Sequence, residues 1–193
     1  KIFRPSTGTP MDDLFARYMY FVRAKRDNNK STTTESLRKF YERDKYSILK
    51  QNSTFDDLKD LAQFWEDIAD QNSERFSKNI LRKLFTLNYA PNSMWNYFIS
   101  VYYMANRNKN GDLNAKEFEI FLDRTIAFIW GYAIIHPGVN ALRTPLFAEM
   151  LNIVNLNEVT FSEFKFNKEK TKSIEVLEMK LKKENLIFRF ATE

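Results

Sequence analysis

Side chains that carry oxygen recur at short intervals between residues 106 and 117 of this 193-residue chain. Three asparagines alternate with basic residues, and Gly111 follows them at a position suited to a sharp turn. The candidate metal ligands are Asn106, Asn108, Asn110, Asp112 and Glu117. Carboxylate and amide oxygens are the ligands that hard divalent cations prefer, so the chemistry suggested by this segment is cation binding.

The spacing of these residues matches the twelve-residue loop of an EF-hand, which binds calcium. Two observations weigh against calcium. Only Asp112 and Glu117 carry negative charge, and position 1 is Asn106 where an aspartate is usual. The sequence also holds no second copy of the loop. We therefore favour a polar loop between two helices, with Asn114 as a helix cap and Glu117 three residues on, as in a capping box. A single EF-hand-like calcium module remains an alternative.

Residues Ser6, Thr7, Gly8 and Thr9 place hydroxyls and backbone N–H groups directly before a predicted helix that starts at Pro10. A helix N-terminus with such groups can bind an anion. No lysine follows at the spacing of a P-loop, so a Walker A motif is excluded. A plain turn is the simpler interpretation of this segment.

The residue types needed for catalysis are scarce. The chain contains no cysteine, and His136 is its single histidine, whereas a His-Asn-His nuclease needs at least two. The carboxylate pairs Asp12/Asp13 and Asp56/Asp57 fall in the first turns of predicted helices, where they favour the helix dipole. Neighbouring residues diverge on a helix, so neither pair forms an acid–base dyad. We predict no catalytic residue in this chain.

Positive charge is concentrated in the first quarter of the chain. Residues 1–50 carry 12 Lys and Arg against 6 Asp and Glu, within a net charge of +5 for the whole chain. The candidate DNA-binding residues are Arg17, Arg23, Lys25 and Arg26. They would form a basic face able to meet phosphates, and the alternative is an ordinary solvated helix surface.

Apolar residues recur every three to four positions through most of the chain, which predicts helices. With only 4 Gly and 5 Pro, we expect an all-α, irregular bundle of about seven to nine helices with a vestigial strand before Ser6. Ser53 or Thr54 is the predicted cap of a long helix. Residues 1–155 should form the bundle, and residues 156–193 a C-terminal extension with a charged helix. The longest apolar run has ten residues, 126–135, which is too short to span a bilayer.

The first 23 residues resemble the second conserved block of the ParB-like domain in GmrSD-type restriction proteins. The matching positions are Phe3, Ser6, Thr7, Gly8, Thr9, Pro10 and Met11, followed by Asp13-Leu14-Phe15 and Arg17-Tyr18. Weaker similarity to the helical half of that family continues at Leu37-Arg38, Phe40-Tyr41, Asp57-Leu58, residues 64–68 and residues 140–147. Pro5 departs from the polar residue that often stands there.

The resemblance implies a helical, non-catalytic fragment of a bacterial anti-phage restriction protein that senses modified DNA. Members of the family bind nucleoside triphosphate and cleave modified or phage DNA, so NTP and Mg are the cofactors implied for the whole protein. The family's Asp-Gly-Gln-Gln-Arg signature and its His-Asn-His nuclease part are absent from this chain. The implied partners are therefore DNA, contacted through the full-length protein, a missing N-terminal ParB-like core and a nuclease domain. The implied location is the cytoplasm. Ser6, Thr7, Gly8 and Asp13 would border the nucleotide pocket. A helical protein-interaction domain is the third alternative.

Overall fold

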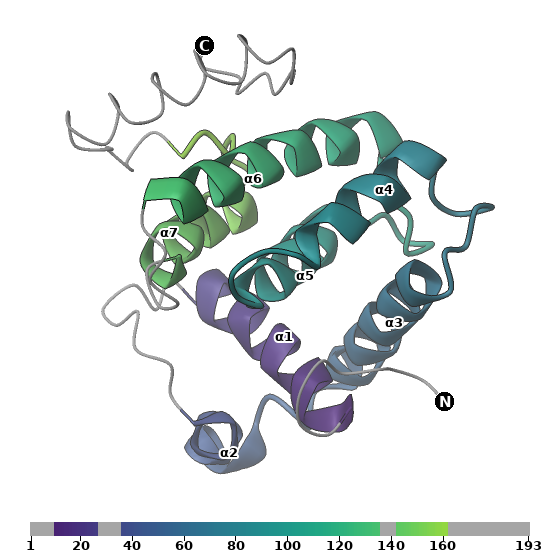
Figure 1. The fold of residues 1–193 in the computed structure, drawn as a ribbon. Coiled ribbons are helices and arrows are strands. Elements are labelled where there is room, and N and C mark those ends of the chain that lie inside the picture. The colour runs from purple at the N-terminus through teal and green to yellow at the C-terminus, as the bar shows by residue number, and fades with distance from the viewer. Residues whose placement is uncertain (1–9, 27–35, 136–141, 162–193) are drawn as a thin grey trace, which may run out of the picture.

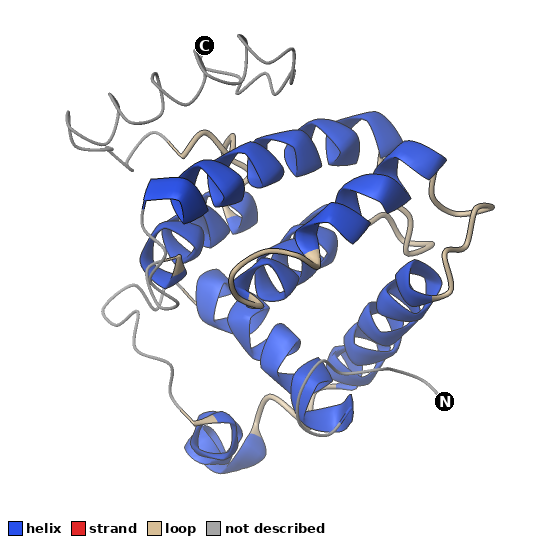
Figure 2. Cartoon of the chain, in the orientation of Figure 1, coloured by secondary structure: helices blue, strands red, loops and turns tan. Residues whose placement is uncertain are grey.

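The computed structural model describes residues 10–26, 36–135 and 142–161, and every regular element in them is helical (Figure 1, Figure 2). The prediction of an all-α, multi-helix fold is confirmed. The strand expected before Ser6 and the charged helix expected in the extension lie outside the described residues. The elements are α1 (Pro10–Lys25), α2 (Leu37–Glu42), the 3-10 turn η1 (Arg43–Tyr46), α3 (Asn52–Ala69), α4 (Lys78–Leu87), α5 (Met94–Asn106), α6 (Ala115–Ile135) and α7 (Arg143–Val154).

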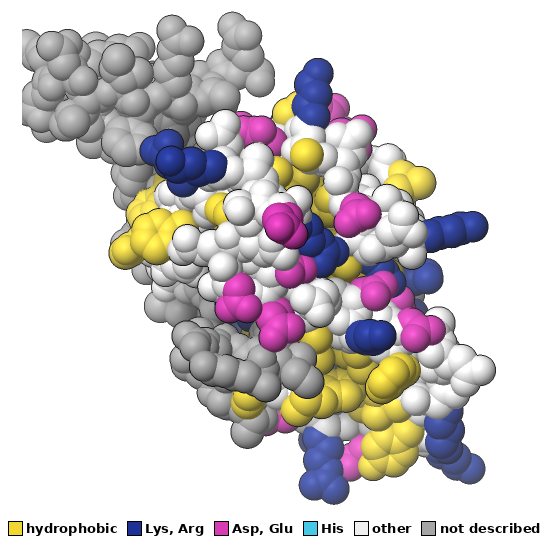
Figure 3. Space-filling view, turned by 90° about the vertical axis from the view of Figure 1, so that its right-hand side faces the viewer, with side chains coloured by type: hydrophobic (Ala, Val, Ile, Leu, Met, Phe, Trp, Pro, Cys, Tyr) yellow, Lys and Arg dark blue, Asp and Glu magenta, His cyan; other side chains and the backbone are white. Residues whose placement is uncertain are grey.

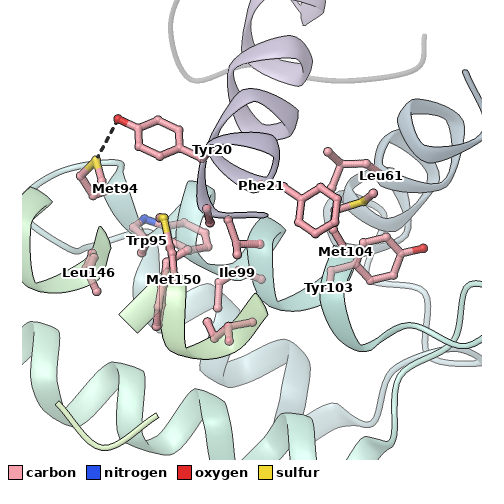
Figure 4. Close-up of a cluster of buried hydrophobic side chains, with 14 of the residues drawn as sticks. Tyr20, Phe21, Leu61, Met94, Trp95, Ile99, Tyr103, Met104, Leu146 and Met150 are labelled. Carbon is pink, nitrogen blue, oxygen red and sulfur yellow. Dashed lines mark hydrogen bonds between the residues drawn. The ribbon is translucent and has the colours of Figure 1, made fainter. Parts of the chain in front are cut away.

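Helix α1 lies at the centre of the bundle and packs against α5, α7, α3 and α2. All residues from Arg17 to Ala24 are buried, so the second half of α1 is enclosed on every side. Figure 4 shows that Tyr20 and Phe21, adjacent in the chain, point to opposite sides of this helix. Tyr20 donates its hydroxyl hydrogen to Met94 Sδ of α5 at 3.9 Å, and Phe21 points toward Leu61 of α3. The second half of α1 is thus buried all round, whereas a surface helix buries only one apolar stripe.

Aromatic rings join α3, α5 and α6 into one core. Phe64 of α3 is fully buried, and its ring stacks on that of Tyr103 with the centroids 4.1 Å apart. The rings of Phe76 and Phe64 meet edge-on with their centroids 5.7 Å apart. The Tyr102 ring stacks on that of Phe121 of α6 with the centroids 3.8 Å apart. Offset-stacked and edge-to-face rings add specific attraction to the burial of apolar area. This packing holds α3 and α5 together, and both helices border the pocket described below.

Ion pairs between helices complete the framework. Lys83 of α4 lies 3.1 Å from Glu119 and 2.7 Å from Asp123 on α6. In Figure 1, α4 runs in front of α5 and alongside α6, in agreement with the contacts between α4 and α6. Among residues 10–26, 36–135 and 142–161, no helix combines the length and the apolar character that crossing a bilayer requires.

The first residues beyond position 155 pack back onto the bundle. Phe161 stacks on Phe128 of α6 with the ring centroids 4.0 Å apart, and Val159 is buried. Arg124 Nη1 lies 2.6 Å from Glu158 Oε1 and also donates to the carbonyl of Val159. Residues 156–161 are therefore in contact with α6. The rest of the predicted extension, 162–193, lies outside the described residues.

Candidate functional site

The predicted nucleotide border is described at one position. Asp13 lies half-buried in the first turn of α1, whereas Ser6, Thr7 and Gly8 fall outside the described residues. Asp13 precedes Arg17 by one helical turn, and its negative charge attracts the Arg17 guanidinium. Asp13, a predicted nucleotide residue, and Arg17, a predicted DNA residue, therefore lie one turn apart on the same helix.

Arg17 is an interior residue, with 5% of its surface exposed. Its Cζ atom lies 4.1 Å from the centroid of the Trp65 ring, which is a cation–π contact between α1 and α3. Burial lowers the pKa of Arg17 to about 10, and the attraction of Asp13 offsets only part of this effect. The guanidinium is therefore a desolvated cation in an aromatic environment.

Arg17 lines a pocket of about 250 Å³ at the junction of α1, α3, α4 and α5. Trp65, Trp95 and Leu84 form its buried floor. The Trp65 indole is fixed there, because its Nε1–H donates to Ser100 Oγ at 2.9 Å and its ring meets Trp95 edge-on. We refer to this cavity as the Arg17 pocket.

The wall of the Arg17 pocket toward solvent carries three side-chain amides. Gln71 and Asn88 are exposed, and Asn96 is half-buried. The exposed ring of Phe85 lies beside them. The lining contains no Asp or Glu among the residues that the structure describes. Arg17 is consequently the one charged group of this lining within the described part of the chain.

The predicted basic face needs a correction, because two of its four residues lie in the interior. Arg23 is 4% exposed, with its Cζ atom 5.1 Å from the ring centroid of Phe147, and Arg17 occupies the pocket described above. Neither side chain lies on a solvent-facing surface that phosphates could reach. Lys25 and Arg26 are exposed at the C-terminal end of α1. The candidate phosphate contacts on this helix are thus reduced to Lys25 and Arg26.

The loop over 106–117 is organised by its own hydrogen bonds. Asn108 Oδ1 accepts from the backbone N–H groups of Asn110 and Asp112, at 2.8 and 2.9 Å. The Asn106 side-chain amide donates to the carbonyl of Tyr102 at 3.0 Å. Asn114 Oδ1 accepts from the N–H groups at 116 and 117, which confirms Asn114 as the cap of α6. The predicted ligand Glu117 lies in the exposed first turn of α6.

An arginine from another part of the chain adds a further positive charge at this loop. The Arg75 guanidinium donates to the carbonyl of Gly111 and to Asp67, and its Nε atom lies 4.0 Å from Asp112 Oδ1. Within residues 10–26, 36–135 and 142–161, no group of three or more His, Cys, Asp or Glu side chains could hold a metal ion. The hydrogen bonds that Asn108 and Arg75 make in this loop favour its interpretation as a structural connection between two helices over the calcium alternative.

Sequence reasoning missed the Arg17 pocket. Arg17 stands three residues after Leu14 and four before Phe21, both on the apolar face of α1, so the helical period already predicts its burial. Trp65 and Trp95 are both buried, but the cavity between them depends on how four helices meet. His136 falls outside the described residues.

Comparison with known proteins identifies no relative, because no family model, no curated protein and no solved structure matches this chain.

Proposed function

We propose that this chain is the helical, non-catalytic part of a nucleoside-triphosphate-dependent restriction protein. In this proposal it holds a nucleotide-binding part at one end of α1 and DNA at the other. The similarity of residues 1–23 to the GmrSD-type ParB-like family supports the proposal. The observation that carries it is the enclosure of the second half of α1, from Arg17 to Ala24, by its neighbours.

Helix α1 begins two positions after Gly8, which the resemblance places, with Ser6 and Thr7, at the border of the nucleotide pocket. Its second half is buried from Arg17 to Ala24 and contacts α3, α5 and α7. A helix packed on all sides moves with its surroundings, because protein interiors are close-packed and transmit displacement. A nucleotide bound before Pro10 would therefore be coupled mechanically to the whole bundle.

The two ends of α1 would serve different ligands. Asp13 is in the first turn, and Lys25 is the last helical residue, so about 18 Å of helix separates them. Figure 3 shows the side of the molecule on which α3 lies in Figure 1, and there Asp and Glu side chains are interspersed with Lys and Arg. That face is not uniformly basic. The proposed DNA contact is local, at Lys25 and Arg26, because these are the two exposed residues of the predicted basic face.

The salt dependence of DNA binding tests the proposal. We expect the affinity of the full chain for a duplex oligonucleotide to fall as the salt concentration rises from about 50 to 200 mM, because phosphate contacts release counterions. The variant Lys25→Glu/Arg26→Glu should bind about tenfold more weakly at the low-salt end. Fluorescence anisotropy of labelled DNA measures both effects.

A matched variant controls for net charge. Lys78→Glu/Arg82→Glu changes the charge by the same amount at exposed positions of α4. We expect its affinity to stay within about twofold of the original chain. Equal losses in the two variants, or no salt-dependent binding by the full chain, would remove the proposed DNA role. Circular dichroism verifies that both variants are folded.

A further inference from the structure

Another cavity lies between the end of α5, the first half of α6, and the end of α7 with the segment that follows it beside α6 (Figure 1). Its volume of about 540 Å³ falls within the range of about 300–1,000 Å³ that is common for small-molecule sites. An apolar cavity of about 150 Å³ already accepts one benzene ring, so this one has room for a two-ring compound. We refer to it as the Tyr102 cavity, and its lining includes Tyr102, Asn106, Glu117, Phe121, Ile153 and Val159.

The floor of the Tyr102 cavity is apolar. Phe121 and Val159 are buried there, and the Tyr102 ring stacks on that of Phe121 with the centroids 3.8 Å apart. Ile120 and Leu156 also line the cavity, although 45% and 79% of their surfaces are exposed. Exposed aliphatic side chains beside a buried floor leave water when an apolar ligand covers them, which is favourable. The lining therefore suits a ligand with an apolar body.

Two polar groups of this lining are available to a ligand. Among the residues that the structure describes, the Glu117 carboxylate has no ion-pair or hydrogen-bond partner, and the Tyr102 hydroxyl has no hydrogen-bond partner. Burial, together with the negative charge of Glu117, raises the pKa of Tyr102 to about 12. The two groups are thus close enough to interact, and the phenol is protonated at neutral pH.

The charged residues of the lining leave one negative charge uncompensated. Arg124 Nη1 lies 2.6 Å from Glu158 Oε1, so these two charges compensate each other. Within the described part of the chain, Glu117 is the other charged residue of the lining, and its position on α6 is exposed. One carboxylate with one hydroxyl supplies few ligands for a metal ion. An ammonium group, in contrast, has three N–H donors and can bond to both oxygens.

We propose that the Tyr102 cavity binds an organic amine with an aromatic body, the ammonium group against the oxygens of Glu117 and Tyr102 and the body on the apolar floor. Asn106 and Glu117, the first and last positions of the candidate calcium loop, would then border an amine site. This inference is independent of the restriction-protein proposal, because it uses neither the nucleotide segment nor the basic end of α1.

Isothermal titration of the full chain with three indoles of similar shape tests the inference: tryptamine is a cation at neutral pH, tryptophol is neutral and indole-3-acetate is an anion. We expect one saturable site for tryptamine and an affinity at least about tenfold lower for tryptophol, because the charge-assisted hydrogen bonds are lost. Indole-3-acetate should bind most weakly of the three, since Glu117 repels it. Equal affinities for tryptamine and tryptophol, or no saturable binding of tryptamine, would overturn the proposal.

Ethylamine separates the contribution of the ring from that of the charge. It carries the ammonium group without the indole, so we expect it to bind at least about tenfold more weakly than tryptamine. Ethylamine that binds as tightly as tryptamine would refute the role of the apolar floor. These comparisons use the unmodified chain, so they stay decisive even where a variant fails to fold.

Two matched variants locate the site. Glu117→Gln keeps the size of the side chain and removes its charge, and we expect the preference for tryptamine over tryptophol to fall to within about twofold. Glu74→Gln removes the same charge at an exposed position outside the cavity and should keep the preference. Loss of the preference in both variants, or in neither, would contradict the assignment.

Calcium distinguishes the amine site from the EF-hand alternative, because Asn106 and Glu117 take part in both. We expect calcium at about 1 mM to change the affinity for tryptamine by less than about twofold, since a single carboxylate offers calcium too few ligands. Displacement of tryptamine by calcium at this concentration would overturn the amine assignment.

Discussion

At the scale of single residues, the backbone at Gly111 shows how a loop whose sequence resembles a metal site is packed against its neighbours. Gly111 has φ of +82°, a conformation that residues with a side chain rarely adopt. A Cβ atom there would lie 3.2 Å from the Tyr103 hydroxyl oxygen and 3.4 Å from Arg75 Nη2. The glycine thus permits the close approach of Arg75 to its carbonyl, and Arg75 in turn connects the loop to α3 through Asp67.

Gly111→Ala should lower the free energy of unfolding by about 1–2 kcal/mol, because the positive φ and the tight contacts both disfavour a methyl group. Urea denaturation followed by circular dichroism measures the change. Gly131→Ala in α6 is the matched control, since nothing lies within 4 Å of its Cβ position. That substitution should stabilise the protein by up to about 1 kcal/mol, as alanine is the better helix former. Equal effects of the two substitutions would contradict the packing role of Gly111.

At the scale of helices, Asp57 connects three elements that are distant in sequence. Its Oδ2 atom accepts a hydrogen bond from Tyr18 of α1 at 2.9 Å, and its Oδ1 atom accepts one from Arg107 Nη2 at 2.5 Å. Arg107 follows the last residue of α5 and also donates to Asp60 at 3.1 Å. The neighbouring Asp56 is exposed. The two adjacent aspartates therefore have different roles: Asp57 connects helices, whereas Asp56 lies on the surface.

Asp57→Ala should destabilise the fold by about 2–3 kcal/mol, because it removes a charged hydrogen-bond acceptor from two partly buried donors. Asp56→Ala should change the stability by at most about 0.5 kcal/mol, because Asp56 is exposed and lies beyond the first turn of α3. Chemical denaturation of the two variants in parallel provides the comparison. If Asp56→Ala proved as costly as Asp57→Ala, the connecting role of Asp57 would be refuted.

These particular residues also show what can be read from the sequence and what cannot. The helices were predictable because apolar side chains recur at helical spacing, and Asn114 was predictable because a cap is a local arrangement. The predicted cap at Ser53 or Thr54 is wrong: α3 begins at Asn52, and the Thr54 hydroxyl donates to the carbonyl of Ile48 at 2.7 Å. Arg75 could not be assigned to the loop, because its partner Gly111 lies 36 positions away.

At the scale of the whole molecule, several buried tyrosines make the fold sensitive to alkaline pH. Burial raises the pKa of Tyr18 and of Tyr102 to about 12 each, from 10.0 for an unperturbed phenol. Burial raises the pKa of Tyr41 as well, and its hydroxyl donates to the carbonyl of Phe15 at 2.8 Å. The folded state therefore retains phenol protons that the unfolded chain releases at a lower pH.

The resulting stabilisation is fully present below about pH 10 and should disappear as the pH rises from about 10 toward 12, because over that range the unfolded chain releases phenol protons that the folded state still holds. Urea unfolding at a series of pH values, with tyrosinate absorbance as a second signal, measures this loss. Tyr18→Phe should flatten part of the alkaline decline, whereas Tyr89→Phe at an exposed position should leave it unchanged. An identical decline in both variants would contradict the assignment to buried tyrosines.

The central position of α1 has a consequence for the order in which the newly made protein can fold. This helix is synthesised before its main neighbour α5, which follows about 80 residues later, and that spacing corresponds to roughly 4–16 s of translation at about 5–20 residues per second. During that interval the apolar surface of α1 has no native partner from α5 to cover it. The nascent chain is therefore most vulnerable to aggregation, and most dependent on chaperones, before α5 leaves the ribosome.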